Sequence, residues 1–345
     1  MSVVDLRSDT VTRPTDAMRK AMAEAEVGDD LFGDDPTVRR LQERAAEIMG
    51  KDAATYAPSG TMCNQIALRT LVRHGHEAIA EATAHVITVE KISAATLSGV
   101  TYRPIPGVRG LITAEQVTNA LRPELDPLRT RVVDLVAVEN THQVGGGSVM
   151  PLEKLREIRR VAQDAGLRLY LDGARIFNAS VASGVGVADF AAEADAMMFC
   201  LSKGLGAPIG SLLCGPADFV DEARRVRIQF GGGWRQAGVV AAAGLVALEE
   251  GPGRLHEDHE NAKRLAEGVA ELFPGAADVE AVETNILFVN HEAVGMSPSE
   301  IVARLQIEGV LAGIVTGRVR MLTHRDVSTA DIDRALGAWK TLRAA

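Results

Sequence analysis

The sequence of 345 residues predicts an α/β fold, in which a mostly parallel sheet is sandwiched by helices and a smaller C-terminal α+β domain follows. Two observations predict this class. Short apolar runs typical of buried strands alternate with segments whose apolar residues recur at helical spacing, and this alternation favours a parallel sheet with helices on both faces. Polar clusters also follow the ends of several predicted strands, where open α/β sheets bind their ligands.

The first part of the chain supplies this sheet. We expect an irregular N-terminal arm over residues 1–14 and a large domain over residues 15–250. The predicted strands of the large domain lie at residues 52–57, 78–80, 101–105, 132–138, 167–171, 196–201 and 211–215. Its predicted helices lie at residues 15–26, 38–49, 62–72, 114–122, 152–165 and 235–249. Thr15 is a suitable N-cap for the first helix, and Gly50 ends the second.

The segment Gly251-Pro252-Gly253 separates these elements from a smaller unit. Glycine and proline in succession interrupt regular structure, so we place the small C-terminal domain at residues 254–345. Its predicted helices lie at residues 256–272, 298–308 and 329–343, and its apolar segments lie at residues 279–282, 284–289 and 318–323.

Composition argues against several classes of protein. The net charge of −9 disfavours a nucleic acid or an anionic membrane as the main partner. No run approaches the ~18 apolar residues of a membrane span, and the N-terminus lacks the apolar core of a signal peptide. The three cysteines show no paired spacing, so we expect a cytoplasmic protein without disulfides. Because no His/Cys cluster has zinc spacing, we expect no metal.

Lys203 is the first candidate functional residue. It follows the buried strand at 196–201, and the next seven residues contain three glycines and one proline. Lysine is rarely buried without a partner, and a lysine amine whose pKa is depressed by burial and positive neighbours can form a Schiff base with a carbonyl. The alternative is a surface lysine at the end of a strand.

A second candidate is the turn formed by Ser59, Gly60 and Thr61 between a predicted strand and a predicted helix. This arrangement presents free backbone N–H groups, hydroxyls and the positive end of the helix to an anion. Serine and threonine are also ordinary helix caps, which is the alternative interpretation.

Ionisable side chains at other strand exits can converge on Lys203. His142 and Asp172 each follow a predicted strand, and His85 lies near a further exit. A lysine, an acid and an anion-binding turn are the parts that a pyridoxal phosphate site requires, with Asp172 pairing with the pyridine nitrogen. The alternatives are that Asp172 serves the Asp-Gly turn and that Arg175 is a partner in a surface salt bridge.

Eight motifs, in family order across nearly the whole chain, resemble those of the low-specificity L-threonine aldolases. They are LRSDTVT at 6–12, GDDPTV at 33–38, PSGTM at 58–62, ENTH at 139–142, LDGARIFN at 171–178, SKGLGAP at 202–208, GGGWRQAG at 231–238 and THRDVS at 323–328. The resemblance implies the aspartate-aminotransferase-like fold of pyridoxal phosphate enzymes. It also implies a homotetramer, a dimer of dimers with shared active sites.

The implied activity is a retro-aldol reaction. A carbon–carbon lyase of this family cleaves L-threonine, L-allo-threonine and other β-hydroxy-α-amino acids to glycine and an aldehyde on pyridoxal phosphate. Two rival functions stay open. One is another pyridoxal phosphate reaction on amino acids, namely β-elimination or transamination. The other is a binding protein that has kept the fold without the activity.

The resemblance implies cofactor-binding roles for several residues. Lys203 resembles the Schiff-base lysine, and Asp172 resembles the partner of the pyridinium nitrogen. The turn 59–61 resembles the phosphate-binding turn, and His85 resembles the histidine that stacks on the cofactor ring. Arg235 resembles a residue that reaches the active site of the neighbouring subunit.

Other residues resemble those that contact the substrate. Ser8, Arg175 and Arg320 resemble contacts with the substrate carboxylate or with cofactor oxygens. His142 matches a histidine near the substrate hydroxyl, so His142, or a water that it orders, is the candidate base for the hydroxyl proton. His85 is the rival candidate. A neutral imidazole near pH 7 suits that task.

The sequence departs from the usual family pattern at four positions. Phe32 stands where many members have tyrosine, and Tyr170 stands where histidine is common. Ile228 stands where lysine is common, and Cys63 replaces a usual alanine. These departures leave the core roles in place and affect the fine contacts and the preference for the β-substituent.

Overall fold

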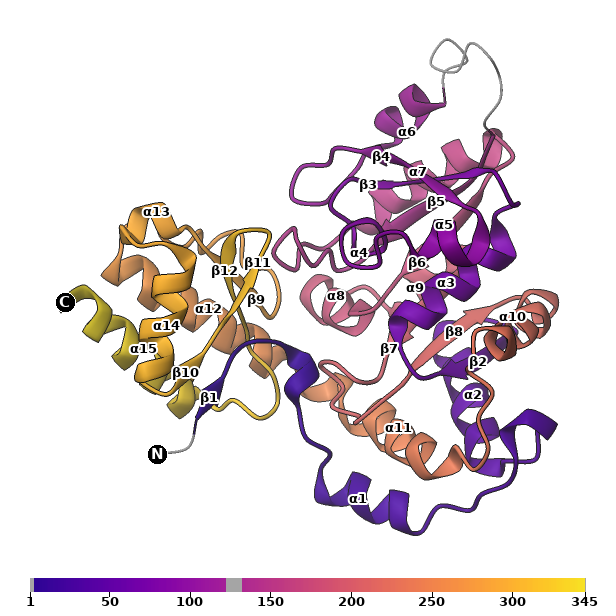
Figure 1. Ribbon diagram of the computed structural model, residues 1–345, viewed down its shortest axis with the longest axis horizontal. Helices are drawn as coiled ribbons and strands as arrows, with labels where there is room; N and C mark the ends of the chain where they lie inside the picture. Colours follow the sequence, from indigo (N-terminus) through magenta and orange to yellow (C-terminus); the bar gives the residue numbers. More distant parts are fainter. Residues whose placement is uncertain (1–2, 122–131, 345) are drawn as a thin grey trace.

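A computed structural model describes residues 3–121 and 132–344, and it contains a seven-stranded central sheet (Figure 1). The strands are β2 (Ala53–Ala57), β3 (Glu77–Glu81), β4 (Thr101–Ile105), β5 (Val133–Glu139), β6 (Arg168–Asp172), β7 (Ala196–Cys200) and β8 (Ser211–Gly215). Their order across the sheet is β2-β8-β7-β6-β5-β3-β4. β8 runs antiparallel to β2 and β7, and every other neighbouring pair is parallel. The predicted mostly parallel sheet is confirmed.

Helices cover both faces of this sheet, as predicted. They include α1 (Asp16–Ala23), α2 (Pro36–Met49), α3 (Gly60–Leu71), α4 (His85–Thr88), α5 (Ser93–Ser98), α6 (Ala114–Ala120), α7 (Leu152–Asp164), α8 (Ile176–Ser183), α9 (Val187–Ala192), α10 (Ala217–Gln229) and α11 (Gly238–Glu250). Val136 and Val138 pack into the core that α2, α7 and α11 share, whereas Leu135 and Ala137 pack into the core of α3 and α10. Successive residues of a strand point to opposite faces, so a strand buried on both faces is apolar throughout.

Some elements differ from the prediction. The helices α8, α9 and α10 lie where no element was predicted, although α10 buries Phe219, Ala223 and Val226 at helical spacing. The apolar segment 279–282 forms turns and bends rather than a regular element. The predicted helix at 114–122 is α6, and the last residue of that prediction lies outside the described residues.

The C-terminal part of the chain builds a sheet and a core of its own. The antiparallel sheet has the order β11-β12-β9 and consists of β9 (Ile286–Val289), β11 (Gly313–Val315) and β12 (Arg318–Leu322). The helices beside it are α12 (Leu255–Leu272), α13 (His291–Val294), α14 (Pro298–Ile307) and α15 (Thr329–Ala344). Leu265, Leu287, Ile301 and Trp339 are buried together there. The domain limits at residues 15–250 and 254–345 stay a prediction.

The N-terminal arm contains regular structure that was not expected. β1 (Val4–Asp5) pairs in parallel with β10 (Val310–Leu311), and Leu6 is buried in the C-terminal core. A 3₁₀ turn, Asp9–Val11, follows, and Ser8 caps it. The arm then crosses from the C-terminal part toward α1, below the central sheet (Figure 1). The described part of the arm is therefore held by the pairing of β1 with β10 and by the capped turn.

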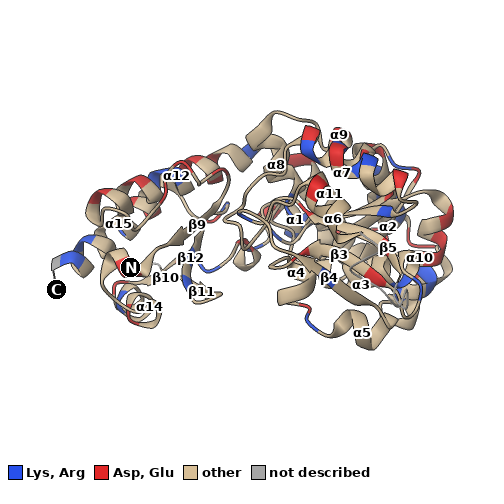
Figure 2. Ribbon diagram, turned by 90° about the horizontal axis from the view of Figure 1, so that it is seen from above, with Lys and Arg blue, Asp and Glu red and all other residues tan. Residues whose placement is uncertain are grey.

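Outer helices such as α7 and α12 carry charged residues of both signs (Figure 2). A mixed surface of this kind is usual for charged globular proteins. In the part of the chain that the structure describes, no helix combines the length and the hydropathy needed to cross a bilayer.

Candidate active site

Three neighbouring parallel strands end at the same edge of the central sheet. Glu139 at the end of β5 is in register with Asp172 at the end of β6, and Asp172 is in register with Met198 of β7. A cavity of ≈ 180 Å³ opens at this edge. The predicted site residues that line it are Ser59, Gly60, Thr61, His85, Asp172, Arg175 and Lys203. Ser8, His142, Arg235 and Arg320 are not among its lining residues.

The turn at 59–61 forms the N-terminus of α3, a helix of 12 residues. The Ser59 hydroxyl accepts a hydrogen bond from the Met62 N–H at 3.2 Å and caps the helix. A Cβ atom on Gly60 would lie 2.7 Å from the Met198 Cε and 2.9 Å from the Cys200 Sγ, so only glycine fits there without movement. The first turn of a helix has unpaired N–H groups and a positive partial charge, and this turn therefore suits an anion.

Asp172 is the buried acid of the cavity. Its Oδ2 accepts a hydrogen bond from the Asn64 Nδ2 at 2.8 Å, and its Oδ1 accepts one from the Ala174 N–H at 3.1 Å. Burial and the neighbouring charge of Glu139 raise the pKa of Asp172. A cationic group at this carboxylate would stabilise its ionised form, because opposite charges favour each other most in a buried site.

His85 is the first residue of α4, and two carboxylates fix it. Its backbone N–H donates to the Glu139 Oε2 at 2.7 Å, and its Nδ1 lies 2.9 Å from the Glu90 Oε1. Burial opposes protonation of the ring, but the hydrogen bond to Glu90 and the charges of Asp172 and Glu90 outweigh burial and raise the pKa of His85. The ring lines the cavity with a defined orientation.

Lys203 stands on a closed loop between β7 and β8. The Gly206 N–H donates to the Lys203 carbonyl at 2.8 Å, and the Ala207 N–H donates to the Leu201 carbonyl at 3.0 Å. Gly206 has a φ of 84°, in the left-handed region that glycine adopts easily. The glycine-rich sequence therefore closes a tight loop that holds the half-buried Lys203 at the cavity.

Arg175 is not a free arginine, because it pairs with the arm. Its Nε and Nη2 donate to the two carboxylate oxygens of Asp9 at 2.6 and 2.7 Å, and both side chains are buried. Burial opposes ionisation of Asp9, but the charge and hydrogen bonds of Arg175, with the charge of Lys203, lower the pKa of Asp9 to about 2. Asp9 was not among the predicted site residues.

Arg320 is a buried guanidinium that has no acidic partner in an ion pair among the described residues. Its Nη2 donates to the Arg7 carbonyl at 3.1 Å, and its Nε has no hydrogen-bond partner. Burial and the nearby charge of Arg175 lower the pKa of Arg320 to about 10. Ser8 precedes Asp9 on the same arm, and its hydroxyl caps the 3₁₀ turn through the Thr10 N–H at 3.2 Å.

His142 lies behind the cavity wall and is fully buried. Its Nδ1 accepts a hydrogen bond from the Gly145 N–H at 3.1 Å, and its Nε2 lies 3.1 Å from the Glu81 Oε2 and 3.8 Å from the Glu139 Oε2. Burial opposes protonation, but Glu139 and Glu81 outweigh it and raise the pKa of His142. Glu139, rather than His142, therefore faces the cavity at this point.

Arg235 and two of the unusual residues lie at the surface, away from the cavity. The Arg235 side chain is 60% exposed and pairs with Asp29 at 3.0 Å. Phe32 and Ile228 are also exposed. Tyr170 differs from them, since it is fully buried and donates a hydrogen bond to Asn64 at 2.8 Å.

Sequence reasoning missed Asp9, Asn64, Glu90 and Glu139. Asp9 and Glu139 belong to the motifs at 6–12 and 139–142. Their partners, Arg175 and His85, lie far away in the sequence, so no local spacing indicates the contacts. Asn64 follows Gly60 by one helical turn, so the two residues share a face of α3. The spacing of one helical turn from the predicted phosphate-binding turn could therefore have indicated Asn64 as a site residue.

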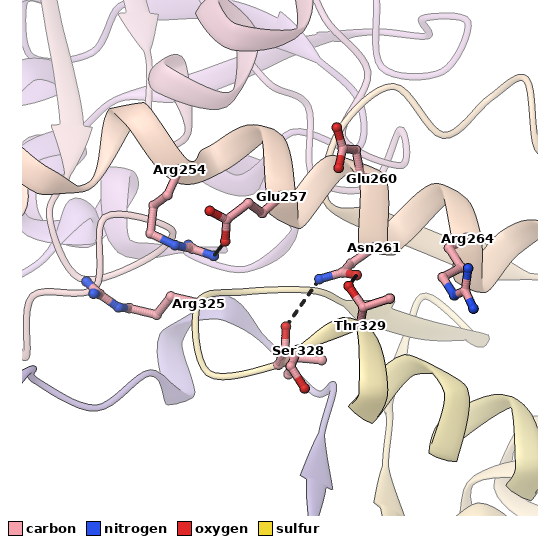
Figure 3. A pocket seen from close by; sticks show the side chains of 9 residues that line it. Arg254, Glu257, Glu260, Asn261, Arg264, Arg325, Ser328 and Thr329 are labelled. Atoms are coloured by element: carbon pink, nitrogen blue, oxygen red, sulfur yellow. Dashed lines mark hydrogen bonds and ion pairs between the residues drawn. The ribbon is translucent and has the colours of Figure 1, made fainter.

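A larger cleft of ≈ 500 Å³ lies between α12 and the segment before α15, and it holds none of the predicted site residues (Figure 3). Its Arg254 pairs with Asp258 at 2.8 Å, and its Arg264 pairs with Asp333 at 2.6 Å. Acidic partners thus neutralise these two arginines, and the candidate site stays at the edge of the central sheet.

The chain resembles known proteins over nearly its full length. Residues 5–293 match the family model described as beta-eliminating lyase. The chain is 40% identical to low-specificity L-threonine aldolase 1 of Arabidopsis thaliana, over 99% of this chain and 96% of that protein. It is 41% identical to the low specificity L-threonine aldolase of Escherichia coli K12, over 99% of this chain and 100% of that protein.

Solved structures share the fold. A threonine aldolase from Leishmania major has a TM-score of 0.81 at 20% identity, covering 99% of each chain. A structure described as SPT with PLP has a TM-score of 0.74 at 16% identity, covering 99% of this chain and 87% of the other. At these identities the likeness shows the fold alone.

Proposed function

This chain belongs to the family of low-specificity L-threonine aldolases, and we propose that it cleaves L-threonine, L-allo-threonine and other β-hydroxy-α-amino acids to glycine and an aldehyde. The enzyme is a carbon–carbon lyase. The observation that carries the proposal is the convergence of Lys203, Asp172 and the turn 59–61 on one cavity.

The cofactor of this family is pyridoxal phosphate, and the residues of the cavity suit it. The N-terminus of α3, where Gly60 leaves no room for a side chain, suits the phosphate, and the buried Asp172 suits a protonated ring nitrogen. When bound, the cofactor supplies an electron sink for the charge that develops at the substrate Cα. We assign three roles toward the cofactor. The Lys203 Nζ is its covalent attachment point, and His85 contacts the face of its ring. Ser59, Gly60 and Thr61 bind its phosphate.

Arg320 is our proposed site for the substrate carboxylate. It is buried, its Nε has no partner, and charge-assisted contacts between arginine and a carboxylate are strong. Ser8 adds a hydroxyl from the arm, and Arg175 adds the N–H donors that its pair with Asp9 does not use. A fixed carboxylate fixes the orientation of the substrate, and orientation decides which bond at Cα is broken.

A base must remove the proton of the β-hydroxyl group, and His85 and His142 are the two candidates. A general base acts within hydrogen-bond reach of its proton or through one water. The position of His85 on the cavity wall favours His85. The enclosure of His142 behind Glu139 favours an indirect role for it, through a water or through Glu139 itself.

The proposed assembly rests on the resemblance. We propose a homotetramer, a dimer of dimers, in which Arg235 reaches the site of a neighbouring subunit. Arg235 is exposed and does not line the cavity of its own chain, and both observations support this role. The three buried free cysteines are consistent with the proposed cytoplasmic location.

A second candidate reaction is β-elimination, since the matching family model carries that description. Product analysis separates the two. The purified holoenzyme is incubated with L-threonine, and the proposed function predicts acetaldehyde and glycine. Formation of 2-oxobutanoate and ammonia instead would establish β-elimination and overturn the proposal.

A further inference from the structure

Asn64 occupies the centre of a buried hydrogen-bond network that the roles above do not use. It lies on α3 and is 1% exposed. Its Nδ2 donates to the Asp172 Oδ2 and to the Glu90 Oε1, each at 2.8 Å. Its Oδ1 accepts a hydrogen bond from the Tyr170 hydroxyl at 2.8 Å. One amide on α3 therefore connects two residues of β6, Asp172 and Tyr170, with Glu90 in the segment after α4.

The orientation of this amide is determined by its partners. Ionised carboxylates only accept hydrogen bonds, so the amide nitrogen must face Asp172 and Glu90. Tyr170 and Asp172 are two residues apart on β6 and lie on the same face of the sheet, which brings the hydroxyl to the other side of the amide. Burial and the charge of Asp172 raise the pKa of Tyr170, so its hydroxyl stays a donor.

Glu90 extends the network to His85. Its Oε1 lies 2.9 Å from the His85 Nδ1, and its Oε2 accepts a hydrogen bond from the Gln65 Nε2 at 2.6 Å. Asn64 thus contacts both the carboxylate proposed for the cofactor nitrogen and the carboxylate that fixes the histidine. Because both carboxylate oxygens lie 2.8 Å from the same nitrogen, the amide also separates two buried like charges.

We propose that Asn64 is a positioning residue, which holds Asp172 in the orientation that receives the cofactor nitrogen and holds His85 through Glu90. The inference rests on the proposed function only for the identity of the cofactor. The Tyr170 hydroxyl holds the oxygen of the same amide.

The test measures cofactor binding rather than turnover. Apoenzyme variants are titrated with pyridoxal phosphate to obtain the dissociation constant, and the visible absorbance of each loaded variant is followed against pH. Asn64→Leu removes the hydrogen bonds to Asp172 and Glu90, and it should weaken cofactor binding roughly 10- to 100-fold and shift the midpoint of the absorbance titration. Gln65→Leu is the comparison that disturbs Glu90 alone, because Gln65 is buried on the same helix and contacts Glu90 but not Asp172.

Each outcome decides the proposal. Weakened binding and a shifted titration in Asn64→Leu, both larger than in Gln65→Leu, support it. Unchanged binding in Asn64→Leu, or equal losses in both variants, overturns it, since equal losses mean that the contact with Asp172 contributes nothing. If Asn64→Leu does not fold, Tyr170→Phe decides: weaker binding supports the proposal, and wild-type binding overturns it. A wild-type protein that binds the cofactor but releases no aldehyde contradicts the proposed function and leaves this test intact.

Discussion

Asp9 and Arg175 form a buried bidentate ion pair, with Oδ2–Nε at 2.6 Å and Oδ1–Nη2 at 2.7 Å. The two residues are far apart in the sequence, and the pair fastens the N-terminal arm to the loop after β6. Asn285 also donates to the Asp9 Oδ2 at 3.3 Å. The arm therefore belongs to the candidate active site, since it brings Ser8 toward the region of Arg175 and Arg320.

The first prediction concerns the stability that this pair provides. Asp9→Asn leaves the buried Arg175 charge without its partner, and breaking a buried pair in this way costs about 3–5 kcal/mol. We expect this loss in the free energy of unfolding, measured in urea. Asp5→Asn is the control, because the Asp5–Arg7 pair is much more exposed and should contribute at most about 1 kcal/mol. Equal losses in the two variants contradict the account.

The second prediction concerns Arg320 and the substrate carboxylate. Arg320→Ala removes the proposed charge-assisted contact, so the KM for L-threonine should rise roughly 10- to 100-fold. The dissociation constant of pyridoxal phosphate should stay near its wild-type value. Arg318→Ala is a matched control on the same strand, since Arg318 stacks on Phe288 at 4.0 Å and donates to the Val144 carbonyl. A KM that does not change in Arg320→Ala removes Arg320 from the substrate site.

The third prediction is a pH dependence that distinguishes the two histidines. A base must be neutral to accept a proton, and the pKa of His85 is raised by Glu90, so activity should fall as the pH drops through that raised pKa. Glu90→Gln removes the negative charge and should move the acidic limb of the kcat profile to lower pH.

His142→Asn provides the comparison for this profile. With His85 as the base, the acidic limb persists in His142→Asn and is lost in His85→Asn. If the limb is lost in His142→Asn and unmoved in Glu90→Gln, the base is His142 and the assignment to His85 is wrong.

The fourth prediction concerns the turn at Gly60. Gly60→Ala places a Cβ 2.7 Å from the Met198 Cε, so the turn or its neighbours must shift, and we expect weaker binding of pyridoxal phosphate. Gly337→Ala is the control, because its Cβ would meet nothing within 4 Å on α15. Binding is measured by titration of the apoenzyme. An unchanged dissociation constant in Gly60→Ala shows that the turn tolerates a side chain and weakens its assignment to the phosphate.

Much of the fold could be predicted from local patterns. Inner strands of the central sheet such as β5, β7 and β8 are buried on both faces, so they are mostly apolar runs, and such runs can be recognised in a single sequence. The pairing of β1 with β10 could not be predicted, because Val4 and Val310 lie far apart in the sequence and come together only in the folded protein. Partners at such distances leave no periodic signal.

The site divides in the same way. Lys203, Asp172 and the turn 59–61 were predicted because strand exits of a parallel sheet converge. The resemblance, rather than residue patterns, suggested Arg320. Networks such as the one around Asn64 depend on hydrogen bonds between three separate segments, and residue spacing does not encode them.

The central claim is that Lys203 anchors retro-aldol chemistry on pyridoxal phosphate. The most direct measurement is the release of acetaldehyde and glycine from L-threonine and L-allo-threonine by the loaded wild-type enzyme, beside Lys203→Ala at the same protein and cofactor concentrations. The account predicts equal amounts of the two products from the wild type and background levels from the variant. Wild-type rates in Lys203→Ala, or no aldehyde from the loaded wild-type enzyme, would contradict it.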